Sequence, residues 1–68
     1  MTLPLTVNGE ALPFPDGCTV EALVEHLAIG RKGVAVAVNA EVVPRSRWAT
    51  TTLAPGDAVE VLRAAQGG

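Results

Sequence analysis

The dipeptide Asn8-Gly9, set between two segments of alternating polarity, constrains the fold of this chain more than any other feature. Asn-Gly is the strongest short signal for a two-residue β-hairpin turn, because both residues tolerate a positive φ. Before it, apolar residues alternate with the period of a half-buried strand (Leu3, Leu5 and Val7). A two-residue turn places Leu12 opposite Leu5. It also places Phe14 opposite Leu3, so the predicted hairpin buries one face.

One later segment has the period of a helix. Thr19 is placed to cap it, since a Thr hydroxyl accepts a hydrogen bond from a free N–H group of the first turn. Apolar residues then recur at i, i+3, i+4 and i+7 and form a single stripe (Val20, Leu23, Val24 and Leu27). Gly30 is placed to end the helix as its C′ residue. The sequence therefore predicts one helix that packs through one face.

Three further strands are predicted in the rest of the chain, at 33–38, 41–43 and 58–63. Asn39-Ala40 connects the first two, and Pro55-Gly56-Asp57 has the Pro-Gly order of a type II turn. Alternate valines of these strands are predicted to face the helix (Val34, Val36, Val38, Val59 and Val61). The order ββαβββ predicts an α+β domain with a mixed sheet covered on one face. Its most familiar form is the β-grasp, or ubiquitin-like, arrangement.

The composition argues against several classes of function. The net charge is −2 and the pI is about 5.1, whereas nucleic acids and anionic membranes attract basic surfaces. No apolar run approaches the roughly 20 residues that span a bilayer. The first residues also lack the basic stretch of a signal peptide. One cysteine cannot form an internal disulfide, so we expect a cytoplasmic protein.

The last two residues, Gly67-Gly68, indicate a chemical role for the C-terminus. A terminal glycine carboxylate is unhindered and ionised at neutral pH, so it can attack the α-phosphate of ATP and become an acyl-adenylate. Without Cβ atoms, the backbone of this pair fits a narrow channel. We predict a folded domain at 1–63 and a flexible tail at 64–68. Gly68 is the predicted reacting residue, and the residues predicted to thread into a partner's active site are Ala65, Gln66 and Gly67. A Gly-rich end without a role is the alternative.

The segment Val43-Pro44-Arg45-Ser46-Arg47-Trp48 resembles the Val-Pro-Arg-x-x-Trp motif of the ThiS family, the sulfur carriers of thiamine thiazole synthesis. The resemblance extends over essentially the whole chain, through Val7-Asn8-Gly9-Glu10, Thr19-Val20, Ala37-Val38-Asn39 and Gly56-Asp57. It implies that a ThiF-type enzyme, using ATP and magnesium, adenylates the carboxylate of Gly68. A persulfide donor protein then supplies sulfur, and the resulting thiocarboxylate serves a ThiG-type thiazole synthase. The chain itself is then a carrier and not an enzyme. It binds no metal or cofactor of its own.

The alternation that buries the valines also predicts an interaction surface. Ala35, Ala37 and Leu62 must lie on the outer face of the sheet, close to Ala64 at the start of the tail. Small residues make this face flat, and Leu62 gives it one apolar anchor. Apolar patches with polar rims often mark interaction sites, so these four residues are the predicted partner interface.

Two other functions remain open at this point. A diglycine end is shared with the small subunits of molybdopterin synthase, which are also sulfur carriers. TGS-like and related β-grasp domains bind RNA or protein without using their termini. A free-standing enzyme is the least favoured class, because the sequence offers no convergent cluster of polar residues.

The remaining candidate residues have structural explanations. Cys18 is expected to be an inert buried thiol more often than a persulfide carrier. His26 is expected to be a solvated helix residue, and Glu21 and Glu25 are expected to form a solvated face. Arg45 and Arg47 are expected to be surface residues, although they could grip an acidic partner. Trp48 is expected to anchor one end of a core that has Phe14 as its only other aromatic residue.

Overall fold

The computed structural model describes residues 2–27 and 33–63. The predicted helix end at Gly30 and the predicted tail at 64–68 lie outside these residues. The elements appear in the order β1 (Thr2–Val7), β2 (Glu10–Pro15), α1 (Val20–Leu27), β3 (Val34–Val38), β4 (Glu41–Val43), a short 3-10 helix η1 (Arg45–Arg47) and β5 (Ala58–Arg63).

The hairpin of β1 and β2 has the register that its sequence predicts. Leu5 lies opposite Leu12 and Leu3 opposite Phe14. Asn8 and Gly9 both have positive φ, at 52° and 84°, which is the conformation of a type I′ turn. The register is therefore set locally, by a turn and an alternation that agree.

Helix α1 begins where Thr19 predicts, and its first turn is fully capped. The Thr19 hydroxyl accepts a hydrogen bond from the Ala22 N–H at 3.1 Å. The N–H groups of Val20 and Glu21 donate to the carbonyls of Thr51 and Trp48, at 2.9 and 3.1 Å. The three first donors of the helix are thus satisfied by residues of the chain itself.

The other strands follow the predicted pattern with one difference. β3 begins at Val34 and not at Gly33, because Gly33 has a φ of 71°, outside the range of a strand. Asn39 and Ala40 form the turn between β3 and β4, and both have positive φ. In the turn before β5, Gly56 has a φ of 85° and the Asp57 N–H donates to the Ala54 carbonyl at 3.1 Å, as the type II pattern predicts.

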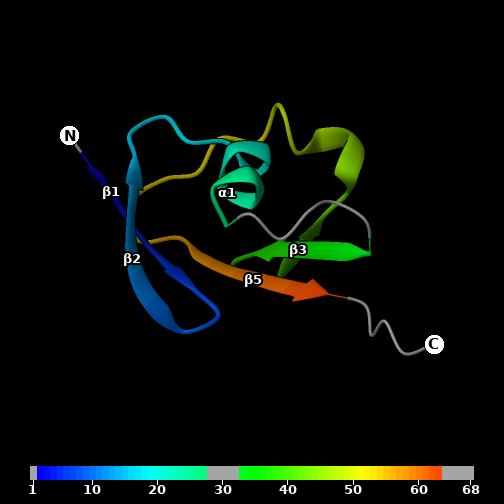
Figure 1. Ribbon diagram of the computed structural model, residues 1–68, viewed down its shortest axis with the longest axis horizontal. Coiled ribbons are helices and arrows are strands. Elements are labelled where there is room, and N and C mark those ends of the chain that lie inside the picture. Colours follow the sequence, from blue (N-terminus) through cyan, green and yellow to red (C-terminus); the bar gives the residue numbers. More distant parts are fainter. Residues whose placement is uncertain (1, 28–32, 64–68) are drawn as a thin grey trace.

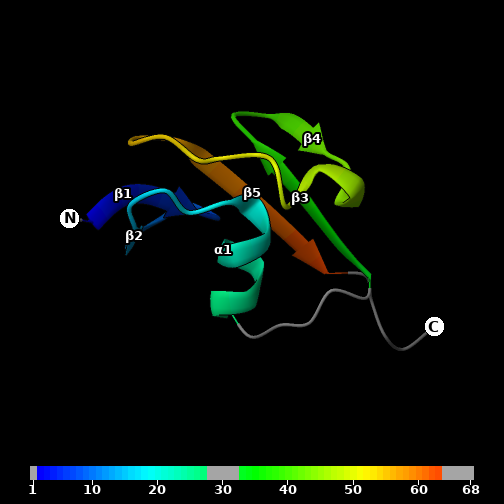
Figure 2. The same ribbon diagram turned by 90° about the horizontal axis from the view of Figure 1, so that it is seen from above.

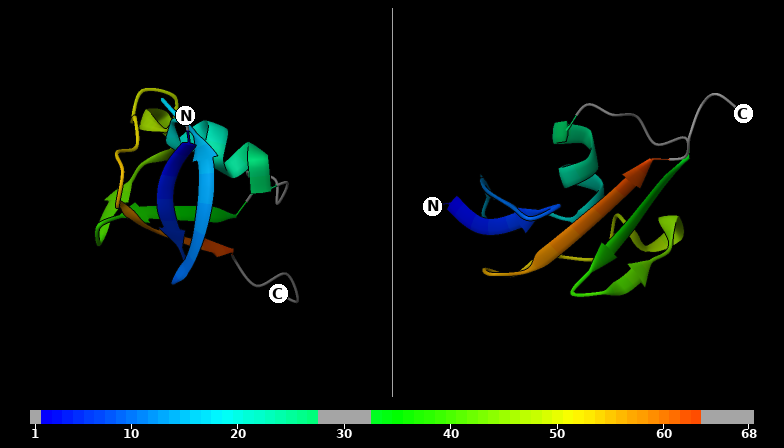
Figure 3. Two further views of the ribbon diagram at one scale, coloured as in Figure 1. Left: turned by 90° about the vertical axis from the view of Figure 1, so that its left-hand side faces the viewer. Right: turned by 90° about the horizontal axis from the view of Figure 1, so that it is seen from below.

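The five strands form one mixed sheet in the order β2-β1-β5-β3-β4. β1 and β5 are parallel, and the other neighbours are antiparallel. Helix α1 covers one face of this sheet, which will be called the inner face (Figures 1 and 2). Seen from below, β5 runs through the middle of the sheet between β1 and β3 (Figure 3, right). The α+β arrangement with one covered face is therefore confirmed.

The core lies between the inner face and the helix. It contains most of the apolar residues that alternation and the helix stripe predict (Leu3, Leu5, Val7, Phe14, Val20, Leu23, Val24, Val36, Val59 and Val61). The other predicted inward residues are only partly buried and pack against its margin (Leu12, Leu27, Val34 and Val38). Trp48 closes one end of it, with 1% of its surface exposed, and its Nε1 donates to the Val43 carbonyl at 3.0 Å. Leu53 and Cys18 are also buried there.

Candidate functional site

The outer face of the sheet has an apolar patch, which we call the outer patch (Ala35, Ala37, Val42 and Leu62). Ala35 lies opposite Leu62 in the β3–β5 ladder. Ala37 lies opposite Glu60 on one side and Val42 on the other. Among the described residues, the exposed large hydrophobic side chains are Val42, at 71%, and Leu62, at 68%. Both belong to this patch.

The predicted outward positions of Leu62, Ala35 and Ala37 are confirmed as positions in the sheet. Leu62 and Ala35 are exposed, and Ala37 is half-buried between its neighbours. Val42 is an addition that the sequence analysis missed. The signal was available, because the inward direction of Val43 fixes the opposite direction for Val42. The fourth predicted interface residue, Ala64, lies outside the described residues, as do Ala65, Gln66, Gly67 and Gly68.

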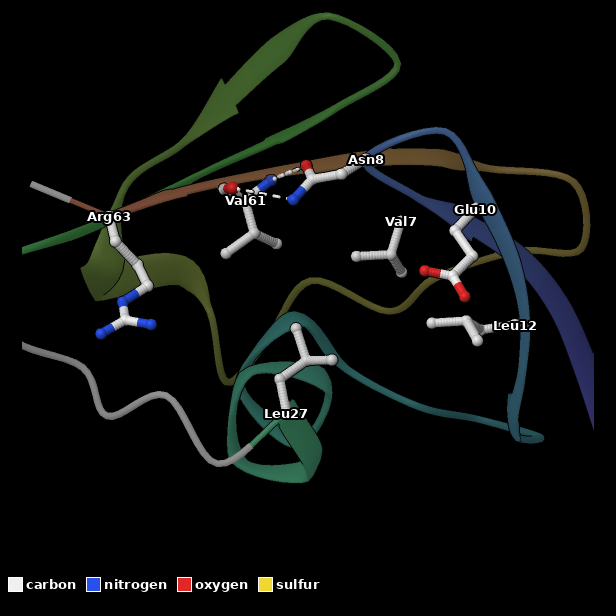
Figure 4. A pocket seen from close by; sticks show the side chains of 7 residues that line it. All are labelled: Val7, Asn8, Glu10, Leu12, Leu27, Val61 and Arg63. Carbon is white, nitrogen blue, oxygen red and sulfur yellow. Dashed lines mark hydrogen bonds between the residues drawn. The ribbon is translucent and has the colours of Figure 1, made fainter.

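On the inner face, a cleft opens beside the end of β5 (Figure 4). Its volume is about 290 Å³. It is lined by apolar side chains from three strands and the helix, with one carboxylate and one guanidinium at its margins (Val7, Asn8, Glu10, Leu12, Leu27, Val61 and Arg63). The sequence analysis did not predict this cleft, because its residues are brought together from four separate elements.

The Asn8 side chain forms two hydrogen bonds at the rim of this cleft. Its Oδ1 accepts from the Val61 N–H at 2.8 Å, and its Nδ2 donates to the Val61 carbonyl at 3.1 Å (Figure 4). The sequence analysis treated Asn8 only as a turn residue. Both contacts join residues 53 positions apart, so no local pattern could reveal them.

Cys18 has the properties of a structural thiol. It is 6% exposed, and its Sγ donates to the Thr19 carbonyl at 3.3 Å. Burial raises the pKa of the Cys18 thiol above its ordinary value, which keeps it protonated at neutral pH. A protonated, buried thiol is a poor nucleophile, in agreement with the expected inert role.

The charged candidates are exposed, as expected, except for Glu21, which is half-buried. His26 is exposed, and its ring meets the edge of Phe14 with the centroids 5.1 Å apart. The Arg45 guanidinium stacks over the Trp48 ring at 5.5 Å from its centroid. Arg47 has an exposed side chain, and its carbonyl accepts a hydrogen bond from the Thr51 hydroxyl at 2.7 Å. These arginines therefore support the turn that holds Trp48.

Within residues 2–27 and 33–63, no three His, Cys, Asp or Glu side chains are grouped so as to hold a metal ion. Across the same residues, the helix is too short to cross a bilayer.

The sequence model of the ThiS family matches residues 4–68. The chain belongs to the ThiS family. It is 32% identical to the sulfur carrier protein ThiS of Escherichia coli, over 97% of this chain and 100% of that protein. It is 37% identical to the sulfur carrier protein ThiS of Thermus thermophilus, over 91% of this chain and 95% of that protein.

A third relative is a larger protein. The chain is 38% identical, over 97% of its length, to part of a thiazole synthase of Paramagnetospirillum magneticum, of which it spans only 20%. A ThiS protein from Geobacter metallireducens has the same fold in its crystal structure. The TM-score is 0.82 at 35% identity, over 97% of this chain and 100% of that one. These likenesses confirm the ThiS-like β-grasp fold that the sequence predicts.

Proposed function

We propose that this chain is a sulfur carrier protein for thiazole formation in thiamine synthesis, and that sulfur is loaded on the carboxyl group of Gly68. The observation that supports this most is the similarity to a ThiS sulfur carrier protein over the whole length of that protein. The family match also extends through residue 68. Both named carriers are ThiS proteins, which favours thiazole over molybdopterin synthesis.

The proposed chemistry begins with activation of a carboxylate. The Gly68 carboxylate attacks the α-phosphate of ATP, held with magnesium by a ThiF-type enzyme, and pyrophosphate leaves. A persulfide of a donor protein then attacks the acyl carbon and displaces AMP. Cleavage of the sulfur–sulfur bond by a thiol leaves a thiocarboxylate on Gly68. Each step uses a group of a partner enzyme, and this chain supplies the acyl carbon.

The described structure supports a carrier more than an enzyme. Cys18 is buried and protonated, and His26 contacts Phe14 on the surface of the helix. A buried, protonated thiol is a poor nucleophile, and the His26 ring packs against an apolar side chain. The catalytic groups are therefore assigned to the partners. A ThiG-type synthase is the proposed sulfur acceptor, in keeping with the similarity to part of a thiazole synthase.

We assign partner docking to the outer patch. Leu62 lies on β5, six positions before Gly68 in the sequence, so a partner that covers this patch holds a part of the chain that is close in sequence to the proposed reacting residue. Two exposed apolar side chains on a flat surface of alanines provide area that a partner can bury. Ala64, Ala65, Gln66 and Gly67 are the proposed link between this surface and the enzyme's active site.

The test of the function is ATP–pyrophosphate exchange with a ThiF-type enzyme. Deletion of Gly68, or addition of one residue after it, should abolish exchange, because the free glycine carboxylate is the reacting group. The same residue added before Met1 is the control and should leave exchange unchanged. Wild-type exchange from a chain extended at its C-terminus would disprove the proposal. After complete sulfur loading, the intact mass should rise by the difference between one sulfur and one oxygen atom.

A further inference from the structure

The C-terminal half of β5 is not paired with β1. β1 pairs with β5 only through Thr6–Ala58 and Val7–Val59. All five residues of β3 pair with β5, from Val38–Val59 to Val34–Arg63. Among the described strands, β5 therefore has a neighbour on one side only beyond Val59, although it is a central strand of the sheet.

On this side of β5, Asn8 provides hydrogen bonds that a neighbouring strand would otherwise provide. Its backbone N–H donates to the Val59 carbonyl at 2.8 Å, the last backbone bond of the β1–β5 ladder. Its side-chain amide then binds both the N–H and the carbonyl of Val61, at 2.8 and 3.1 Å. A carboxamide presents one donor and one acceptor, so it occupies the place of a peptide group and extends the ladder toward the end of β5.

The residue type at position 8 meets two separate requirements. The φ of 52° favours Gly, Asn or Asp. The contact with Val61 needs a donor and an acceptor together, which Gly lacks and an ionised Asp cannot supply. Only Asn among these three meets both requirements. The turn alone would not require a carboxamide, since Gly-Gly also forms such turns.

We propose that Asn8 is a positioning residue for the reactive C-terminus. By holding Val61, it orders the end of β5 from which the segment 64–68 continues in sequence. An activating enzyme then receives an ordered strand end and need not order it on binding. Such preorganisation lowers the cost of association. This inference rests on the proposed carrier function, and it concerns a residue far in sequence from Gly68.

A matched control lies at the other end of β5. Asn39 also has a positive φ, of 51°, in a two-residue hairpin turn. Its Oδ1 accepts from the Ala58 N–H at 3.0 Å, and its Nδ2 donates to Asp57 Oδ1 at 3.0 Å. Its backbone N–H also donates to the Ala58 carbonyl at 2.7 Å. Asn39 thus holds the start of β5 as Asn8 holds its end. Asn39→Gly removes a similar set of side-chain bonds away from the reacting segment.

The experiment compares Asn8→Gly with Asn39→Gly in ATP–pyrophosphate exchange with a ThiF-type enzyme, below the melting temperature of both. For Asn8→Gly, we expect KM to rise about fivefold to tenfold, comparable to the loss of one or two hydrogen bonds, with kcat within about twofold. Asn39→Gly should keep the wild-type KM. Asn8→Asp keeps the turn and one acceptor and should raise KM in the same direction, which provides a second variant if Asn8→Gly folds poorly.

Hydrogen exchange supplies a readout that does not depend on the enzyme. The Val61 amide should exchange faster in Asn8→Gly and at the wild-type rate in Asn39→Gly. An unchanged KM for Asn8→Gly, or an equal rise in KM for both glycine variants, would overturn the positioning role. If the wild-type chain supports no ATP–pyrophosphate exchange with the enzyme, the proposed carrier function fails. The hydrogen-exchange rate of the Val61 amide remains a separate test. If that rate is the same in Asn8→Gly as in wild type, Asn8 does not order the end of β5.

Discussion

At the scale of single residues, the buried thiol of Cys18 decides between two places for the transferred sulfur. Its Sγ donates to the Thr19 carbonyl just before α1, and the residue is only 6% exposed, which hinders attack by a persulfide donor. We therefore predict that Cys18→Ser keeps thiocarboxylate formation close to wild type. The measurement is intact mass after reaction with the activating enzyme and a persulfide donor. A folded variant that no longer accepts sulfur would assign the sulfur to Cys18.

The same variant gives a pH readout with a definite sign. Burial raises the pKa of the Cys18 thiol in the folded state, so the folded protein holds this proton more tightly than the unfolded chain does. The resulting stability is present below the unfolded pKa of about 8.5 and is lost as the pH rises through the folded pKa. Wild type should thus lose stability above about pH 8.5, and Cys18→Ser should lose less. Denaturant titrations at pH 7 and pH 10 provide the comparison.

At the scale of elements, the alternation along β5 separates core from docking surface. Val61 is 6% exposed and Leu62 is 68% exposed. Leu62→Asp should therefore leave the melting temperature nearly unchanged. It should also weaken binding to the activating enzyme by about tenfold or more, since burial of a Leu side chain contributes ~1.5–3 kcal/mol. The measurement is KM for the carrier in pyrophosphate exchange.

Ala22→Asp is the matched control for this substitution. It adds the same charge at an exposed position of α1, which covers the opposite face of the sheet. A carboxylate in the first turn is favoured by the helix dipole, so the variant should fold normally and bind the enzyme as wild type does. Equal KM values for Leu62→Asp and Ala22→Asp would argue against the outer patch. A large loss of stability in Leu62→Asp would place Leu62 in the core.

The elements that the sequence predicted well are those defined by local physics. The β1–β2 register follows from Asn8-Gly9 and a period of two, and the start of α1 follows from Thr19 and a period of 3.6. The segment between η1 and β5 has neither period, and its buried Leu53 was missed. Its order comes from distant contacts, such as the Leu53 N–H to the Cys18 carbonyl at 2.9 Å. Such contacts leave no periodic signal in the sequence.

The candidate site divides in the same way. The outward direction of Leu62 could be read from the alternation of β5, whereas the bond from Asn8 to Val61 depends on the topology that places β1 beside β5. Arg45 was predicted as a surface residue that could bind an acidic partner, with no structural role. Its stacking on Trp48 requires the turn of η1, which the motif alone does not describe.

At the scale of the whole molecule, the folded core and the proposed reacting group belong to separate parts of the sequence. The described core residues run from Leu3 to Val61, and the proposed acyl carbon lies at Gly68. Removal of residues 64–68 should therefore leave the fold intact and abolish adenylation. This separation allows a test in which docking is measured without chemistry.

We predict that the chain 1–63 inhibits pyrophosphate exchange competitively against the full chain. The outer patch is retained in it, so it should occupy the same surface of the activating enzyme. If the patch supplies most of the binding free energy, its Ki should lie within about tenfold of the KM of the full chain, because each tenfold corresponds to about 1.4 kcal/mol. The same truncated chain with Leu62→Asp should inhibit much more weakly. A folded 1–63 chain that does not inhibit would instead assign the affinity to residues 64–68, and the patch would then have another partner.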